Sequence, residues 1–229
     1  MLIFPFWGSD VSQESDVITA VQLAVTWKGR LDIMFTNAGI EGPNGSITDL
    51  KTDQLKALLD VNPIGIVHGI KHAGKAMIGG GRGGSIVCTS SSAAIKGGLA
   101  GHAYTISKAA IVGLARSAAC ELGRHGIRVD CVSPHGVPTE MLVRGFQRFL
   151  GKADLGSEEV SKIVGEKGSL LRGRGGTVED VAHAVVYLAS DEAVMVGGGR
   201  STPEDGGSSG WDGGGVGDAG SGVAMVRTA

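Results

Sequence analysis

The sequence has 229 residues, 21 basic and 23 acidic side chains, and a formal net charge of -2. This length predicts one domain with a substantial hydrophobic core, and the near-neutral charge excludes an electrostatic basis for binding nucleic acid or an anionic membrane. The three cysteines have no metal-ligand spacing, so we expect buried free thiols and no metal. No apolar run approaches the ~18 residues of a membrane-spanning helix, so we expect a cytoplasmic protein.

The first predicted elements are a helix and a short strand. Residues 9–30 begin with polar side chains and include one stripe of apolar positions, which predicts an amphipathic helix capped by Ser12. The apolar residues 31–35 predict a core strand that leads into the sequence TNAG, where Gly39 permits a sharp turn and a close approach of backbone to a ligand. For Asn37, a structural role in this turn and a contact with a ligand both remain open.

Residues 51–78 predict a long helix with one interruption. Pro63 lies inside it, removes a backbone donor and costs about 3 kcal/mol in a regular helix, so we expect a kink. The helix-spaced pair His68 and His72 is interpreted as two ordinary helix residues rather than metal ligands. The glycine-rich residues 79–84 precede a strand and not a helix N-terminus, so we interpret them as a connection rather than a phosphate-binding loop.

The sequence SIVCT predicts a buried strand near residues 85–90 that ends at Ser91, and a helix follows it. Tyr104 and Lys108 are four residues apart on that helix, so they lie on one face. An ammonium about 4 Å from a phenolate contributes about 4 kcal/mol at an effective dielectric near 20, which would lower a tyrosine pKa from about 10 to about 7. Such a tyrosine could exchange protons near neutral pH while the Ser91 hydroxyl holds a substrate oxygen. The alternative is that all three are ordinary helix and loop residues.

The last predicted elements flank a mixed, polar segment. A strand near residues 127–133 enters the turn PHGVPT. Residues 177–190 predict a helix that opens with a capping box from Thr177 to Asp180. The intervening residues 140–176 are amphipathic at first and then punctuated by glycine.

A set of motifs along the chain resembles, in order and spacing, the short-chain dehydrogenase/reductase family. The motifs are TNAG, Asn62 within DVNPIG, GSIVCTSSSA, YTISK and CVSPHGVPT, and the likeness covers roughly residues 9–194. The amino-acid sequence around YTISK is most similar to that of the plant branch that contains xanthoxin and secoisolariciresinol dehydrogenases. The resemblance implies an α/β fold with a Rossmann-like, doubly wound parallel sheet.

The resemblance also implies a role for each motif residue. Tyr104 would be the general acid/base, Lys108 its electrostatic activator and ribose anchor, Ser91 the oxygen-positioning donor and Asn62 part of a proton relay through water. The implied cofactor is NAD or NADP, with NAD slightly favoured. Its implied binding residues are Asp10 and Val11 beside the adenine, Asn37, Ala38 and Gly39 on the adenine-ribose side, Tyr104 and Lys108, and Pro134, Val137 and Thr139 in the turn after the last predicted strand.

Similar enzymes place a substrate-binding lid in residues 140–176. Met141, Leu142, Phe146 and Phe149 would then select the substrate, although simple packing of a surface helix explains them equally well. We therefore predict an NAD(P)-dependent oxidoreductase that interconverts a secondary alcohol and a ketone on a small hydrophobic, terpenoid- or phenolic-like substrate. The resemblance also implies a homo-dimer or homo-tetramer.

Both ends of the chain depart from the family. Dinucleotide binding in this fold uses a first strand, a glycine-rich turn and a helix N-terminus, which residues 1–8 do not contain. We interpret the chain as N-terminally truncated with an aberrant C-terminus, so that its sheet lacks the first βαβ unit and the last strand. The predicted organisation is a partial Rossmann-type domain over residues 1–196 and a glycine-rich, disordered tail over residues 197–229. The alternative function is a catalytically dead relative that acts only through dimerisation, and we expect this chain alone to bind NAD or NADP weakly.

Overall fold

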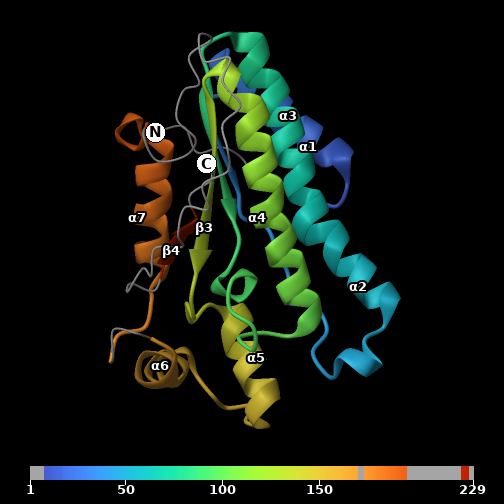
Figure 1. The fold of residues 1–229 in the computed structure, drawn as a ribbon, viewed down its shortest axis with the longest axis vertical. Helices are drawn as coiled ribbons and strands as arrows, with labels where there is room; N and C mark the ends of the chain where they lie inside the picture. Colours follow the sequence, from blue (N-terminus) through green and yellow to red (C-terminus); the bar gives the residue numbers. More distant parts are fainter. Residues whose placement is uncertain (1–7, 170–172, 195–222, 227–229) are drawn as a thin grey trace, which may run out of the picture.

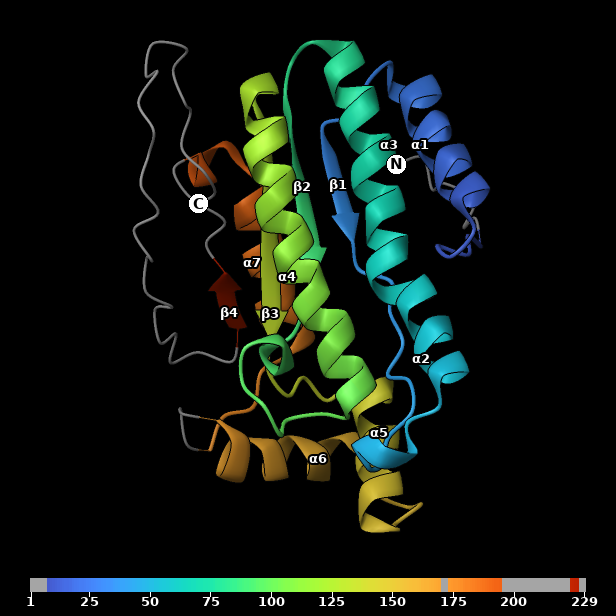
Figure 2. The ribbon, with the colours of Figure 1, turned by 45° about the vertical axis from the view of Figure 1, so that its right-hand side comes forward.

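The computed structural model describes residues 8–169, 173–194 and 223–226, and Figures 1 and 2 show the arrangement of its elements. The strands form one sheet in the order β1-β2-β3-β4. They are β1 (Ile33–Thr36), β2 (Gly84–Thr89), β3 (Ile127–Pro134) and β4 (Val223–Val226). The helices are α1 (Glu14–Lys28), α2 (Thr52–Leu59), α3 (Gly65–Gly80), α4 (His102–Leu122), α5 (Glu140–Leu150), α6 (Ser157–Ile163) and α7 (Val178–Ala189), with π-helical turns η2 (Asp60–Ile64) and η5 (Val164–Gly168).

The central strands of the sheet are parallel. Ile33 is in register with Ser85 between β1 and β2, and Gly84 is in register with Ile127 between β2 and β3. Parallel neighbours need a crossover connection, which α2 and α3 provide between β1 and β2 and α4 provides between β2 and β3. The predicted strands near residues 31–36, 85–90 and 127–133 and the Rossmann-like α/β sheet are therefore confirmed.

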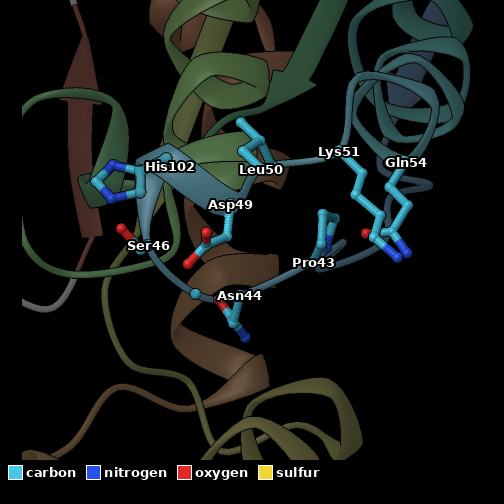
Figure 3. Close-up of a pocket in the computed structure, with 9 residues that line it drawn as sticks. Pro43, Asn44, Ser46, Asp49, Leu50, Lys51, Gln54 and His102 are labelled. Carbon is cyan, nitrogen blue, oxygen red and sulfur yellow. The ribbon is translucent and has the colours of Figure 1, made fainter.

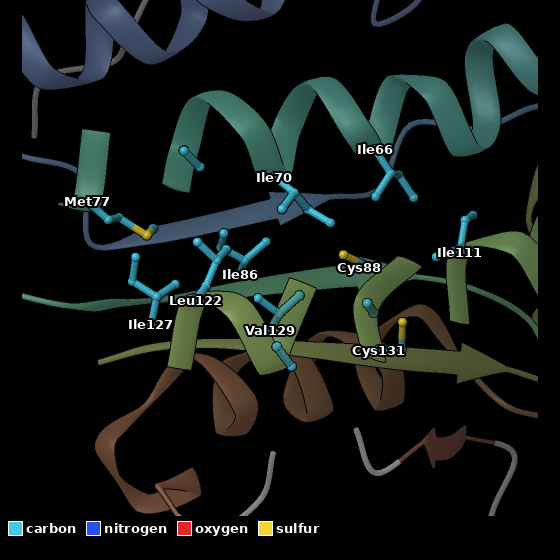
Figure 4. Close-up of a cluster of buried hydrophobic side chains, with 13 residues drawn as sticks. Ile66, Ile70, Met77, Ile86, Cys88, Ile111, Leu122, Ile127, Val129 and Cys131 are labelled. Carbon is cyan, nitrogen blue, oxygen red and sulfur yellow. The ribbon is translucent and has the colours of Figure 1, made fainter. Parts of the chain in front are cut away.

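Helices cover both faces of this sheet. In Figure 2, α3 and α4 lie in front of the strands, α1 packs against α3, and α7 lies behind β2 and β3. Figure 4 shows the larger core between α3, α4 and the sheet, where Ile70, Ile86 and Ile111 are buried. A smaller cluster around Val132 and Leu188 fills the space under α7. Fully burying a side chain of this size contributes about 1.5–3 kcal/mol, so these two clusters fix both helical layers to the sheet.

The helix predicted over residues 51–78 is interrupted where the sequence indicates. The π-helical turn η2 separates α2 from α3, and both Asn62 and Pro63 are buried within it. A proline removes one backbone donor, and a π-helical turn is a common way to accommodate such a local break. The predicted distortion at Pro63 is confirmed, and it brings the Asn62 side chain into the interior.

Two details of the helices differ from the sequence-based expectation. Gln13, and not Ser12, is the N-cap of α1, because the Ser12 hydroxyl donates a hydrogen bond to Asp10 Oδ1 (2.8 Å). Cys88 and Cys131 are buried as expected, but Cys120 is exposed on α4, so the prediction of burial is wrong for this thiol. The capping box of α7 is confirmed, since Asp180 N donates to Thr177 Oγ1 (3.1 Å) and Thr177 N donates to Asp180 Oδ2 (3.0 Å).

The end of the chain adds a strand that we did not predict. Within residues 197–229, the structure describes residues 223–226, which form β4 and pair antiparallel with β3, and the rest of the predicted tail lies outside the described residues. These four residues form a short strand that the sequence did not predict, and its pairing covers the free edge of β3. The boundary between a domain and a tail near residue 196 remains a prediction.

Two expected absences concern the described part of the chain alone. Among those residues, no helix has the length and apolar character that crossing a membrane requires. The same residues contain no cluster of three or more potential metal ligands.

Candidate active site

The predicted site residues converge on one edge of the sheet. Because β1, β2 and β3 are parallel, their carboxyl ends lie at the same edge, and the segments 37–39, 90–92 and 134–139 leave the strands there. In open α/β sheets this edge is where ligands bind. Helix α4 runs alongside the sheet (Figure 2). Tyr104 and Lys108 lie in its first two turns, and Lys108 Nζ reaches the Thr89 carbonyl at the end of β2.

Lys108 is fixed at the end of β2 by two contacts. Its Nζ donates a hydrogen bond to the carbonyl of Thr89 (2.9 Å), and its own carbonyl accepts one from the hydroxyl of Ser90 (2.8 Å). The Lys108 side chain is almost completely buried, and burial lowers its pKa to about 8. Ser90 therefore has a structural role in docking α4 on β2, and Lys108 is an amine that gains or loses its charge near neutral pH.

Tyr104 and Ser91 meet through their side chains. Burial raises the pKa of Tyr104, and Ser91 is near enough to the phenol to oppose this effect. Ser91 Oγ accepts a hydrogen bond from Ala93 N (3.2 Å). The expectation that Lys108 lowers this pKa is wrong for this structure. The ammonium is directed to the Thr89 carbonyl and lies 5.5 Å from the centre of the tyrosine ring rather than beside the phenol oxygen.

Asn62 connects the turn after β1 to α4. Its Oδ1 accepts a hydrogen bond from Ile40 N (2.8 Å), and its Nδ2 donates to Ile40 O (2.9 Å) and to Ser107 Oγ (3.0 Å). A Cβ added at Gly39 would lie 3.2 Å from Asn62 Oδ1 and 3.5 Å from Lys108 Nζ. The fold thus brings together Asn62, Gly39 and Lys108. The role of Asn62 in a proton relay through water stays a prediction.

The remaining predicted cofactor residues lie in separate segments. Asn37 and Ala38 are exposed, and Asn37 Oδ1 accepts a hydrogen bond from Thr89 Oγ1 (3.0 Å). Asp10 is exposed before α1, where its carboxylate accepts hydrogen bonds from Ser12. Val11 packs against Gly65 of α3, where an added Cβ would lie 2.7 Å from Val11 Cγ2.

The histidines of α3 have structural partners. His68 Nδ1 lies 3.0 Å from the Val11 carbonyl, and His72 Nε2 lies 2.7 Å from Glu14 Oε1. Both hold the N-terminal segment on α3, in keeping with their interpretation as ordinary helix residues.

Pro134 is the last residue of β3, and Val137 and Thr139 lie in the turn that follows. Val137 O accepts a hydrogen bond from Thr139 N (2.7 Å), and Thr139 is the exposed N-cap residue of α5. His135 is a residue that sequence reasoning missed. Its Nδ1 lies 2.8 Å from Ser92 Oγ and its Nε2 lies 2.9 Å from the Gly168 carbonyl, so it links residues 90–92 to η5.

The predicted lid forms α5, α6 and η5 below the sheet edge in Figure 1. Leu142 and Phe146 pack against the buried cluster of Leu155, Val160 and Val164, which fits the packing alternative for these two residues. Met141 and Phe149 are exposed, Phe149 to 86%. Met141 and Phe149 are therefore the more exposed two of the four predicted selectivity residues, and Leu142 and Phe146 are partly buried.

The sequence also did not predict a contact between α5 and the segment after β1. Glu41 forms an ion pair with Arg148 of α5, and Glu41 Oε1 accepts a hydrogen bond from Asn44 Nδ2 (2.8 Å). The two charged residues are 107 positions apart, so no local sequence pattern connects them.

Next to this contact lies a small surface hollow, drawn in Figure 3. Asn44, Ser46 and Asp49 line it together with His102 from the start of α4, and its volume is about 50 Å³. Pockets for cofactors and drug-sized ligands measure about 300–1,000 Å³, so this hollow is too small to be the site of a dinucleotide.

Comparison with known proteins gives a consistent result. A family model described as "Enoyl-(Acyl carrier protein) reductase" matches residues 5–209. The chain is 59% identical over 184 residues to Short-chain dehydrogenase reductase ATA1 of Arabidopsis thaliana, covering 80% of this chain and 68% of the relative. It is 43% identical over 194 residues to (+)-borneol dehydrogenase 2 of Salvia officinalis (84% and 68% covered). It is also 43% identical over 190 residues to secoisolariciresinol dehydrogenase of Forsythia intermedia (82% and 66% covered).

Solved structures resemble the fold over a similar extent. An NAD+-bound xylitol dehydrogenase superimposes with a TM-score of 0.72 and 29% sequence identity, covering 82% of this chain and 73% of that structure. Carveol dehydrogenase from Mycobacterium avium in complex with NAD gives a TM-score of 0.73 and 33% identity, covering 80% and 67%.

Proposed function

Because this chain belongs to the short-chain dehydrogenase/reductase family, we propose that it is an NAD(P)-dependent oxidoreductase that interconverts a secondary alcohol and a ketone. The observation that carries the proposal is that Ser91, Tyr104 and Lys108 lie together at one edge of the sheet, where Lys108 is buried, bonds to the Thr89 carbonyl and lies 5.5 Å from the Tyr104 ring. A hydroxyl, a phenol and an amine at this edge suit proton transfer to or from a substrate oxygen.

In the proposed mechanism, Ser91 holds the substrate oxygen and Tyr104 moves the proton. Oxidation of an alcohol needs Tyr104 as a base, and reduction of a ketone needs it as an acid. Lys108 Nζ donates to the Thr89 carbonyl beside Tyr104, and its lowered pKa of about 8 means that the lysine charge depends on pH in the working range. The bound nicotinamide supplies or accepts the hydride.

The proposed cofactor edge fits a dinucleotide at several points. Asn37 and Ala38 are exposed, and Gly39 leaves the space beside Lys108 Nζ that a side chain would fill. We place the adenine side of the cofactor near Asp10, Val11 and this turn, and the nicotinamide side near Pro134, Val137 and Thr139. NAD is favoured over NADP, and the solved relatives described as NAD-bound support this choice.

We further propose a small hydrophobic, terpenoid- or phenolic-like substrate. The relatives named for borneol and secoisolariciresinol support this class. Met141 and Phe149 on α5 offer exposed apolar surface that could contact such a substrate.

A homo-dimer or homo-tetramer in the cytoplasm completes the proposal. Ile106 of α4 and Ile64 beside α3 are 43% and 41% exposed, which gives these long helices apolar surface for a second subunit. The same feature supports the second candidate, a relative without catalysis that acts only through dimerisation. Light scattering of the purified protein, together with an Ile106→Glu variant, tests the subunit contact.

The decisive experiment combines cofactor titration with turnover. Binding of NAD and NADP is measured by calorimetry, and a panel of terpenoid and phenolic alcohols is assayed by absorbance at 340 nm. The 229-residue chain is compared with a version that also carries the segments by which the Arabidopsis relative exceeds the matched region. We expect micromolar cofactor binding and turnover in the extended version and weaker binding in the chain alone. An extended version that binds cofactor but oxidises no alcohol would favour the dimerisation candidate.

A further inference from the structure

A carboxylate that the proposed mechanism does not use lies between the turn after β1 and the lid. Glu41 follows that turn and makes an ion pair with Arg148 of α5, while Asn44 Nδ2 donates a hydrogen bond to its Oε1 (2.8 Å). The Glu41 side chain is 22% exposed and that of Arg148 is 62% exposed. The carboxylate is therefore the sheltered member of the pair.

The backbone of α5 sits directly on this carboxylate. A Cβ added at Gly145 would lie 3.1 Å from Glu41 Oε1, so the missing side chain lets the carboxylate pass under the helix. Gly145 and Arg148 are three residues apart and hence share one face of α5. Glu41 contacts the lid through both positions.

The same contacts continue to the catalytic helix. A Cβ at Gly101, the N-cap residue of α4, would lie 2.3 Å from Asn44 Oδ1, so the Asn44 amide is packed against the start of α4. Tyr104 follows three residues later. An uninterrupted path of contacts thus runs from Arg148 through Glu41 and Asn44 to the helix that carries Tyr104.

The charge of Glu41 also acts on Tyr104. Burial is the main cause that raises the pKa of this tyrosine, and the negative charge of Glu41 raises it further, against the effect of Ser91. Charged groups on the elements around this region include Glu41, Arg148 of α5 and Lys108 of α4, which lies 5.5 Å from the tyrosine ring. Asp49, Lys51 and His102 line the hollow beside Asn44.

We propose that Glu41 is a positioning residue for the reaction, which holds helix α5 against residues 40–46 and, through Asn44, against the start of the helix that carries Tyr104. The proposal rests on the proposed function for its catalytic meaning. The contact between α5 and residues 40–46, and the effect of the Glu41 charge on Tyr104, can both be measured in the chain without cofactor or substrate.

The tie is tested by amide hydrogen exchange of the 229-residue protein. Glu41→Gln should speed exchange in both α5 and residues 40–46 by about two- to fivefold, as expected for a partly exposed ion pair. Arg144→Gln is the matched control, because it removes the Glu140 pair within α5 and leaves the turn untouched. Unchanged exchange in Glu41→Gln would overturn the tie.

The local charge is tested by titrating the phenol itself. The sequence contains two tyrosines, Tyr104 and Tyr187, so a Tyr187→Phe background isolates Tyr104 in the phenolate absorbance near 295 nm. Glu41→Gln should lower the titration midpoint, whereas Arg148→Gln, which loosens the lid but keeps the carboxylate, should not lower it. Equal midpoints in Glu41→Gln and its parent, or equal downward shifts in both variants, would show that the charge has no such role.

The two failures are distinguishable. A protein that shows both effects but turns over no alcohol contradicts the proposed function and leaves the tie standing. A protein that turns over alcohol but shows neither effect contradicts the role of Glu41 alone.

Discussion

Replacing Asn62 with alanine should destabilise the protein more than any exposed substitution near the site. The side chain is completely buried and makes three hydrogen bonds, two of them to the backbone of Ile40. Removing it leaves the Ile40 N–H and carbonyl without these partners, at about 1–3 kcal/mol each, while Ser107 Oγ keeps its bond to the Tyr104 carbonyl (2.8 Å). We expect a loss of about 3 kcal/mol, a large part of a total stability of about 5–15 kcal/mol.

Urea denaturation followed by circular dichroism measures this loss. With a slope of about 1–3 kcal/mol per molar urea, the midpoint should fall by at least about 1 M. Asn37→Ala is the control, because this exposed amide accepts one hydrogen bond, from Thr89 Oγ1 (3.0 Å), and its removal should cost at most about 1 kcal/mol. Equal midpoints for the two variants would refute the view that Asn62 anchors the turn after β1.

Three further substitutions have defined outcomes in the same denaturation assay. Gly69→Ala should destabilise by about 1–3 kcal/mol, because the new Cβ would lie 2.5 Å from Thr36 Cγ2; a neutral result would mean that this contact can relax. Gly113→Ala, with nothing within 4 Å, should instead stabilise α4 by about 0.5–1 kcal/mol, and a loss of stability would contradict the open space seen there. Asp130 is buried, its Oδ2 has no hydrogen-bond partner among the described residues, and burial raises its pKa to about 6 from an ordinary value of 3.8. A carboxyl whose pKa is raised by folding stabilises the protein below its unfolded pKa and loses that contribution as the pH rises through about 6. Wild-type stability should therefore fall by about 2 kcal/mol relative to Asp130→Asn between pH 4 and pH 7. Parallel pH profiles for the two proteins would contradict the burial of an ionisable Asp130.

The sequence predicted those features that follow from local patterns. Apolar runs predicted three parallel strands, Pro63 predicted the break that became η2, and the spacing of Thr177 and Asp180 predicted a capping box. Each of these depends on residues within one or two turns of each other, where periodicity and backbone chemistry are decisive.

The features that were missed depend on side-chain direction or on distant partners. Tyr104 and Lys108 do share a helix face, but the Thr89 carbonyl draws the ammonium away from the phenol oxygen. Glu41 and Arg148 meet only because the sheet edge gathers the turn after β1 and the lid at one place. Strand β4 was missed because a short apolar run in a glycine-rich tail has no local signal that identifies its partner strand.

Replacement of Tyr104 by phenylalanine tests the central claim most directly. Alcohol-dependent formation of NADH or NADPH is followed at 340 nm in the extended version of the protein and in its Tyr104→Phe variant, and cofactor affinity is measured on the same samples. Because the phenol proton acts in the chemical step while the ring only packs, we predict that kcat falls by at least about 100-fold and that the cofactor dissociation constant changes little. A variant that retains kcat, or whose defect is confined to KM, would contradict the role of Tyr104 as the acid/base.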